Sequence, residues 1–346
     1  MANGLSDITV KLNIEQPSVP VNMGVLAIFN KASKEGEVAG SKEYSDGKEF
    51  AADYPETTST GKVGQGYFNQ ADHGEKLVVI TYADQITSSA DEYYDKGWEF
   101  ATVTGEGAED DVVTLAQYLD GKGERFAVYA YPAVSGLIDG LDDTAEKYAG
   151  IKRAIVLVAG EDGAAASYGV GALVGALGNE TVGSITWKFK TLGGVAPVKF
   201  LTVSEVKKLH EKKMFTYVTK AGVNQTSEGT TMGGDFIDAL HGDDWIKASI
   251  ESSLQRLLSS SNKLAFDAAG IATIDAAVTD VLTTATNNGI ILANPETGAG
   301  EFNVTTVSRA DTPAADIALR QYNGLAFSYT RAGAIHSVTV SGEISI

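Results

Sequence analysis

The sequence predicts an α/β domain followed by an α+β domain, with extended strands at the two ends of the chain. Three observations predict this fold class. Apolar strands alternate with helical segments between about residues 25 and 182, which is typical of a largely parallel sheet covered on both faces. Two long amphipathic helices follow beyond residue 241. Both chain ends alternate apolar and polar residues.

The first terminal strand is predicted over residues 7–14. Its apolar positions alternate with polar ones, and Pro17 and Pro20 separate it from the rest of the chain. The C-terminus mirrors this pattern, because its apolar residues share one parity from His336 onward. We therefore expect a strand with one apolar face at each end, formed by Ile8, Val10, Leu12 and Ile14 and by Val338, Val340, Ile344 and Ile346. Such a strand can pair with its own sheet or with that of another subunit.

The α/β region reads as alternating strands and helices. Strands are expected over residues 25–29, 76–82, 98–103, 126–131 and 153–159. Helices are expected over residues 47–53, 62–69, 84–96, 109–119, 135–148 and 164–177. The last helix is rich in glycine and alanine. Because glycine inside a helix costs about 1 kcal/mol relative to alanine, these residues indicate close packing against another backbone.

The second region has a different character. It opens with strands expected over residues 184–189 and 215–219, on either side of a helix at 204–213. The helix over residues 242–260 has acidic residues at its start and one apolar stripe, and a second helix over 269–288 ends at Gly289. Strands over residues 302–307 and 324–330 complete an α+β unit.

Composition narrows the classes of function. The 346 residues include no cysteine, which excludes disulfides and thiolate chemistry and fits synthesis in a reducing cytoplasm. We expect no membrane insertion, since no stretch approaches the ~18 apolar residues of a membrane span, and the N-terminus has no secretory pattern. The net charge of −18 argues against direct binding of nucleic acid.

Lysines gather in one part of this acidic chain. Residues 186–213 contain seven lysines against Glu205 and Glu211. This cluster is a candidate binding face for an acidic partner, with a solvated lysine-rich helix as the alternative. The candidate residues are Lys207, Lys208, Lys212 and Lys213.

No pattern in the sequence indicates an enzyme or a cofactor site. The glycines of Gly169-x-Gly171-x-x-x-Gly175 follow a strand, as in a dinucleotide-binding loop, but eight residues separate them from it where a tight turn is required. Asp235, Asp238, His241, Asp243 and Asp244 have metal-ligand chemistry, but a turn and a helix start that attracts acidic residues explain them without a metal. We expect no cofactor and no metal site, and no nucleophile and base stand in a catalytic pattern.

Four segments in order give the chain a family resemblance. These are residues 183–197, 233–238, 244–246 and 333–336, of which the first reads G-S-I-T-W-K-F-K-T-L-G-G-V-A-P and the last G-A-I-H. Together they resemble the sheath protein of contractile tails, found in contractile phages and phage-derived particles. The resemblance runs from about residue 7 to the C-terminus and is strongest over residues 184–346.

The resemblance implies a division of the chain. Residues 1–21 would form an N-terminal linking arm, 22–182 an outer α/β domain, 183–333 an inner α+β domain and 334–346 a C-terminal linking strand. The terminal strands would be exchanged between subunits, and the four candidate lysines would face the tail tube.

The resemblance also implies a function and partners. The chain would be a structural subunit that polymerises in stacked hexameric rings around a tail tube protein and contracts to drive the tube through a cell envelope. Baseplate and tail terminator proteins would be further partners. The particle would be a virion tail or tail-like particle made in the cytoplasm of a bacterial host. The alternatives are an α/β enzyme of unknown substrate and another self-assembling surface protein.

Overall fold

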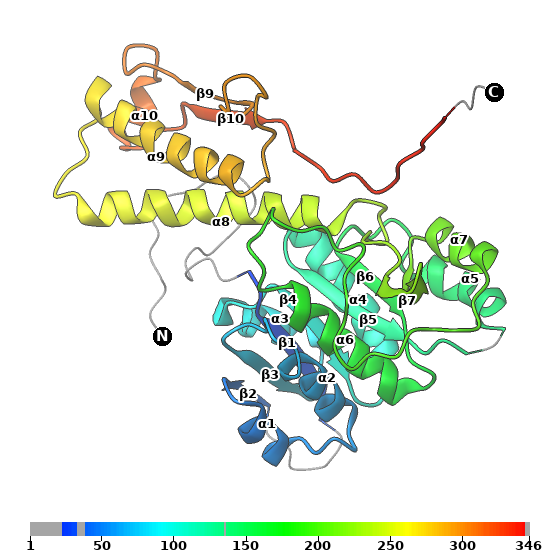
Figure 1. Ribbon diagram of the computed structural model, residues 1–346. Coiled ribbons are helices and arrows are strands. Elements are labelled where there is room, and N and C mark those ends of the chain that lie inside the picture. Colours follow the sequence, from blue (N-terminus) through cyan, green and yellow to red (C-terminus); the bar gives the residue numbers. More distant parts are fainter. Residues whose placement is uncertain (1–22, 33–38, 135, 343–346) are drawn as a thin grey trace.

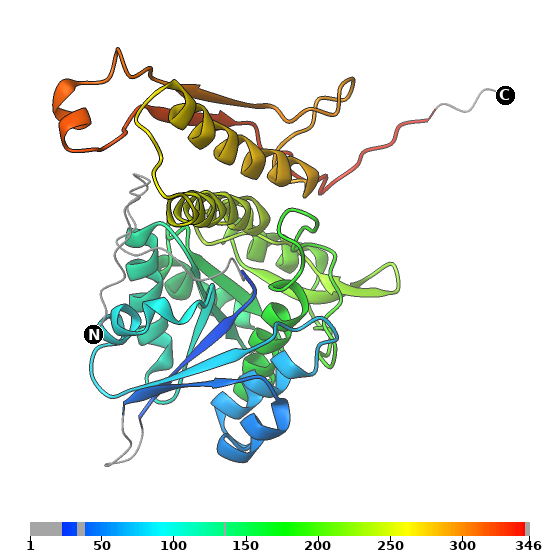
Figure 2. The same cartoon turned by 90° about the vertical axis from the view of Figure 1, so that its left-hand side faces the viewer.

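The computed structural model describes residues 23–32, 39–134 and 136–342 (Figure 1). A large α/β unit carries a smaller unit built from two long helices and a hairpin, and Figure 2 shows helix α8 lying between them. The structure is mixed α/β with a large parallel sheet, so the predicted fold class is confirmed at this level. The predicted N-terminal strand, and Ile344 and Ile346, lie outside the described residues.

The large sheet has eight strands in the order β2-β3-β1-β4-β5-β6-β7-β8. Its six inner strands are parallel, and antiparallel β2 and β8 close its two edges. The strands are β1 Leu26–Lys31, β2 Gly40–Tyr44, β3 Leu77–Tyr82, β4 Phe100–Thr104, β5 Phe126–Tyr131, β6 Ala154–Val158, β7 Phe215–Lys220 and β8 Val223–Thr226. Short β2 and β8 have no clear apolar pattern, and the sequence did not predict them.

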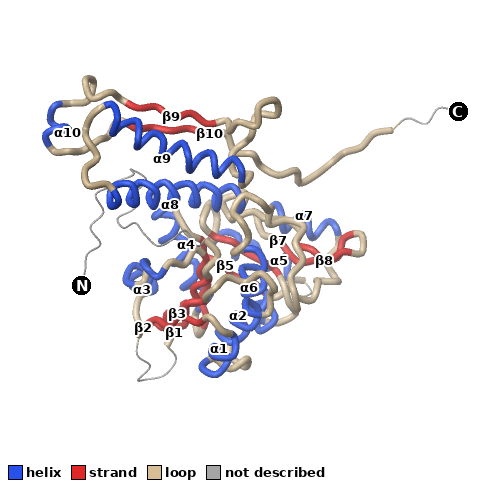
Figure 3. The backbone as a smooth tube through the Cα atoms, turned by 60° about the vertical axis from the view of Figure 1, so that its left-hand side comes forward, coloured by secondary structure: helices blue, strands red, loops and turns tan. Residues whose placement is uncertain are grey.

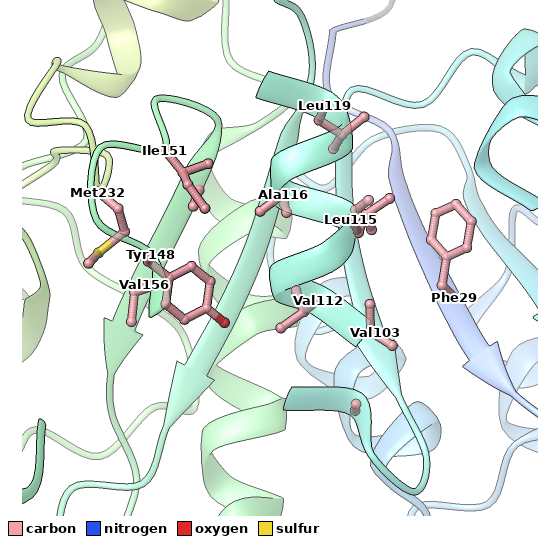
Figure 4. Packing of buried hydrophobic residues seen from close by; sticks show 14 of the residues in the cluster. Phe29, Val103, Val112, Leu115, Ala116, Leu119, Tyr148, Ile151, Val156 and Met232 are labelled. Carbon is pink, nitrogen blue, oxygen red and sulfur yellow. The ribbon is translucent and has the colours of Figure 1, made fainter. Parts of the chain in front are cut away.

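Helices cover both faces of this sheet (Figure 3). One face packs against α3 Ile86–Glu92, α4 Ala108–Lys122, α5 Leu137–Lys147 and α7 Val203–Glu211. A short 3-10 helix, Tyr94–Lys96, follows α3. Figure 4 shows Val112, Leu115, Ala116 and Leu119 of α4 facing side chains of the strands. The other face packs against α1 Gly47–Asp53, α2 Ser59–Phe68 and α6 Gly163–Leu177.

The smaller unit has its own core. It contains α8 Ile237–Ser260, α9 Ala268–Asn287 and the hairpin of β9 Phe302–Thr306 and β10 Leu325–Tyr329, with short α10 Ala314–Ala318 in the connection. By length and composition alone α9 would pass as a membrane span. Its Val278, Leu282 and Ala285 are buried against α8 and the hairpin, however, and a core helix satisfies the same test.

Two expectations need correction. Residues 184–189 form no strand, because Phe189 takes a left-handed conformation (φ 67°) and the backbone here bonds to the end of β8. Trp187 is buried and Phe189 is 46% exposed, so the two side chains do not share one buried face. The boundary expected at residue 183 falls inside the packing of the large unit, since β7 and β8 belong to the eight-stranded sheet.

The small residues of α6 do pack closely against another backbone. A Cβ on Gly171 would lie 1.8 Å from the carbonyl oxygen of Val63 in α2, and one on Gly175 would lie 2.6 Å from that of Tyr67. In return, a Cβ on Gly66 of α2 would lie 2.2 Å from the carbonyl oxygen of Tyr168. The glycines therefore allow α2 and α6 to touch, and they belong to no dinucleotide loop.

We expect Gly171→Ala to destabilise the protein by about 1–3 kcal/mol, because the two helix backbones must move apart. Gly140→Ala in α5 is the matched control, since nothing lies within 4 Å of its Cβ position, and it should be neutral or gain up to about 1 kcal/mol. Urea unfolding measures both. Equal midpoints for the two variants would contradict this packing argument.

Candidate assembly surfaces

The C-terminal segment extends away from the body of the protein (Figures 1 and 2). Residues 332–342 belong to no helix or strand of the described chain. The side chains of Val338 and Val340 are 77% and 87% exposed. The expected C-terminal strand is therefore not formed within the described part of this chain, because a strand requires a neighbouring strand and none lies beside it.

The outer edges of the β9–β10 hairpin pair with no other strand of the described chain, although isolated bridges just beyond its open end join Ile291 to Arg331 and Ala293 to Gly300. The two strands pair only with each other among the described residues, from Leu325 opposite Thr306 to Tyr329 opposite Phe302. Its apolar side chains face the core of the smaller unit, and they are Phe302, Val304, Leu325, Phe327 and Tyr329. A two-stranded sheet with open outer edges is a site where an extended segment can add.

One residue holds the start of the C-terminal segment. In residues 333–342 every side chain is exposed except that of His336, which is 13% exposed. Its Nδ1 lies 2.9 Å from Oε1 of Glu228, and its Nε2 lies 2.8 Å from Oγ1 of Thr186. A carboxylate only accepts, so Nδ1 donates to Glu228, and in the neutral ring Nε2 accepts from the threonine hydroxyl.

The surroundings of His336 are aromatic and charged. The ring meets Phe236 edge to face at 4.7 Å between centroids and Phe189 at 6.1 Å. Lys188 Nζ lies 2.7 Å from the second oxygen of Glu228. Burial raises the pKa of Glu228, but the hydrogen bond and charge of Lys188, with the nearby histidines, bring that pKa below its ordinary value. The carboxylate is therefore ionised and ready to accept from His336.

This arrangement joins segments that carried the family resemblance. Residues 183–197, 233–238 and 333–336 meet around His336. In the fourth segment, residues 244–246, Asp244 pairs with Arg153 instead. Sequence reasoning missed Glu228 and Thr186 as partners of His336. They carry no periodic signal, and they lie 108 and 150 residues away from it in the chain.

A buried charged seam joins α8 to the large sheet. Arg153, just before β6, forms a two-pronged ion pair with Asp244, and the distance from Nη2 to Oδ1 is 2.9 Å. Lys247 Nζ lies 2.8 Å from Oε2 of Glu124. Burial raises the pKa of Asp244 to about 6 despite the arginine. Burial, followed by the Asp244 charge, raises the pKa of Glu99 well above its usual range.

The structure separates the residues with metal-ligand chemistry. Nε2 of His241 donates to the carbonyl oxygen of Met23 at 2.9 Å, and burial lowers the pKa of this histidine to about 4. Asp243 accepts from Tyr329 and Arg331, and Asp244 pairs with Arg153. Within the described ranges no three such residues could hold a metal ion. The helix start expected at residue 242 needs correction, because α8 begins at Ile237 and Asp243 and Asp244 lie within the helix.

The four candidate lysines lie on and just after α7, on the large unit. Lys207, Lys208 and Lys213 are exposed and make no ion pair with any described residue. Lys212 pairs with Asp142 of the neighbouring α5. Figure 1 shows α5 and α7 together, apart from the β9–β10 hairpin. The lysine face is therefore bordered by an acidic helix.

One family model matches part of this chain, and solved structures of similar fold match nearly all of it. Residues 237–344 match the family described as E217 tail sheath protein gp31-like, C-terminal domain. That range holds α8, α9, the hairpin and the start of the C-terminal segment. No curated protein matches the chain.

Solved structures share the fold over nearly the whole chain. The sheath of PVC, an extracellular contractile injection system, in its contracted state has a TM-score of 0.71 at 12% identity, covering 100% of this chain and 99% of that one. The contracted helical sheath of the anti-feeding prophage gives 0.66 at 11% identity, covering 99% and 98%. A sheath tail protein from Desulfitobacterium hafniense gives 0.52 at 10% identity, covering 85% and 92%. The resemblance to contractile sheath proteins is confirmed.

The contribution of the buried ion pairs between α8 and the sheet to the stability of the protein can be measured. Arg153→Met should destabilise the protein by about 3–5 kcal/mol, because it leaves the Asp244 carboxylate buried without its partner. Lys147→Met breaks an exposed pair with Glu109 and Asp110, and should cost less than about 1 kcal/mol. Urea unfolding compares the two, and similar losses would show that the seam contributes no more than a surface pair.

Proposed function

We propose that this chain is the structural subunit of a contractile tail sheath. It polymerises helically around a tail tube and shortens to drive the tube through the envelope of a target cell. The observation that supports the proposal is the set of structural elements in the region that matches the sheath family. Residues 237–344 contain both the open β9–β10 hairpin and the projecting C-terminal segment, a donor and an acceptor for strand addition in one chain.

The linking strands are proposed to pair with hairpins of neighbouring subunits. The C-terminal strand 334–346 presents Val338 and Val340, which are exposed in the described part of the chain and would be buried by pairing with a neighbour. Residues 1–21, with Ile8, Val10, Leu12 and Ile14, form the N-terminal linking arm of the same proposal. The outer edges of β9 and β10, which pair with no other described strand, provide places where strands can add.

The energy of one link is modest. Each added backbone hydrogen bond contributes about 1 kcal/mol net, and each buried apolar side chain about 1.5–3 kcal/mol. Ordering an arm costs about 1–2 kcal/mol per residue, so gains and costs nearly cancel. Stability of the polymer then comes from many links in a closed mesh, through effective concentration.

The proposal extends to partners and to the particle. The subunit forms stacked hexameric rings and binds a tail tube protein, with baseplate and terminator proteins at the two ends of the sheath. We place the outer face of residues 22–182 away from the tube, and α7 together with the smaller unit of α8, α9 and the hairpin toward it. The subunit is made in the cytoplasm of a bacterial host and works in a virion tail or tail-like particle. The stored energy lies in the extended lattice, and contraction needs no nucleotide.

Electron microscopy of the purified protein tests the function. A sheath subunit should form hollow tubes with a helical repeat. Compact particles of fixed size would favour an α/β enzyme, and flat lattices would favour a surface-layer protein.

The apolar face of the C-terminal strand has a matched control in its opposite face. Val338→Lys with Val340→Lys should abolish tubes, because two charges enter the buried side of each link at a cost of several kcal/mol. Ser337→Lys with Thr339→Lys adds the same charge to the other face and should preserve assembly. Light scattering follows assembly, and thermal unfolding of the monomer should be unchanged in both. Tubes from the valine variant would rule out this linking face.

The exposed lysines of α7 are proposed to face an acidic surface of the tube. Lys207→Glu and Lys208→Glu, made singly, should each weaken co-assembly of sheath and tube, and added salt should weaken it in the unchanged protein. Lys48→Glu is the control, since it reverses one exposed lysine on α1 at the other end of the sheet. Co-sedimentation with tubes measures the effect, and normal decoration by all three variants would mean that the lysines are only solvated.

A further inference from the structure

The C-terminal segment leaves the body of the protein at His336, a residue whose side chain is fixed by several contacts. Ile335 is 80% exposed and Val338 is 77% exposed, yet His336 between them is nearly buried. Strand exchange explains the exposed valines. It does not explain why one histidine between exposed residues has both ring nitrogens bonded and two aromatic rings against it.

The contacts of His336 come from three separate places in the chain. Thr186 and Phe189 lie in the segment before α7, Glu228 follows β8, and Phe236 caps the start of α8. The pocket is thus built where the large unit meets the start of α8. This pocket binds the C-terminal segment just after the last strand of the smaller unit.

Part of this pocket is made at a conformational cost. Phe189 is a bulky residue with φ at 67°, a left-handed conformation that is unfavourable for a residue other than glycine. The conformation sets the Phe189 ring against His336, while the ring stays 46% exposed. Lys188, next in the chain, holds Glu228 from the other side at 2.7 Å.

We propose that His336 is a positioning residue that anchors the root of the C-terminal segment and fixes where the linking strand leaves the subunit. The anchor ties the segment to the large unit, so the strand beyond residue 336 starts from a defined place on a rigid surface. A fixed root reduces the orientations that the strand must lose on binding and raises its effective concentration at a neighbour's hairpin. The assembly part of this inference rests on the proposed sheath function.

The anchor itself is measured in the monomer, without assembly. The chain has no cysteine, so Val338→Cys provides a single, exposed site for a nitroxide label. The electron paramagnetic resonance line shape then reports motion two residues beyond the anchor. His336→Ala should convert the label to its mobile component.

A matched pair at Thr186 keeps the volume of the pocket nearly constant. Thr186→Val removes the hydroxyl that bonds Nε2, and should raise the ratio of released to anchored label about fivefold, the equivalent of one net hydrogen bond. Thr186→Ser keeps the hydroxyl and should match the unchanged protein. Equal line shapes for the valine and serine variants, together with an unchanged line shape for His336→Ala, would overturn the anchor.

The assembly role is measured with unlabelled protein. His336→Ala and Thr186→Val should form tubes more slowly than the Thr186→Ser variant, with thermal unfolding unchanged. If the label is released but tubes form at the normal rate, the positioning role is wrong and the sheath function stands. If the unchanged protein forms no tubes, the sheath function fails, and the label experiment still decides whether His336 anchors the segment.

Discussion

The packing of α8 against two cores at once is the constraint on which the rest of the structure depends. Its first turns bury Ile237 and Leu240 with the large sheet, while Ile246, Ile250 and Leu254 belong to the core of the smaller unit. The ion pair of Arg153 with Asp244 lies where these two cores adjoin, and its side chains are 8% and 6% exposed. Separating the units would strand buried charges, so this helix fixes the hairpin relative to the sheet.

The edges of the large sheet and the edges of the β9–β10 hairpin differ in how well they are protected from strand addition. The large sheet ends in short β2, which carries exposed Lys42 and Glu43, and in β8, whose Thr226 is bonded to the backbone at residue 190. The outer edges of β9 and β10 pair with no other strand of the described chain, and isolated bridges reach only the residues just outside these strands. A hairpin alone is marginal in water, and this one survives because its apolar face packs on α9. The subunit therefore protects one sheet from strand addition and leaves another available for it.

The sequence was informative where the signal is local. The apolar stripe of α9 and the buried runs of β3 and β5 are read from neighbours in the chain, and the structure places all three within a few residues of expectation. The segment at 184–189 failed because alternation alone does not supply a partner strand, and because Phe189 turns left-handed. The histidine anchor was beyond reach, since its bonds span 108 and 150 residues. The small residues of α6 gave the correct packing but not the partner helix.

A sheath that shortens needs two arrangements of the same subunits, and the structure indicates where the difference between them must lie. Pulling α8 from the sheet would leave Asp244 and Glu124 without their cations in a buried seam, at several kcal/mol for each charge. Moving the exposed segment beyond His336 costs far less, because residues 337–342 bury no side chain in this chain. Under the proposed function, subunits therefore move as rigid bodies. The strands between the His336 anchor and a neighbour's hairpin take up the change in angle, and the links survive it.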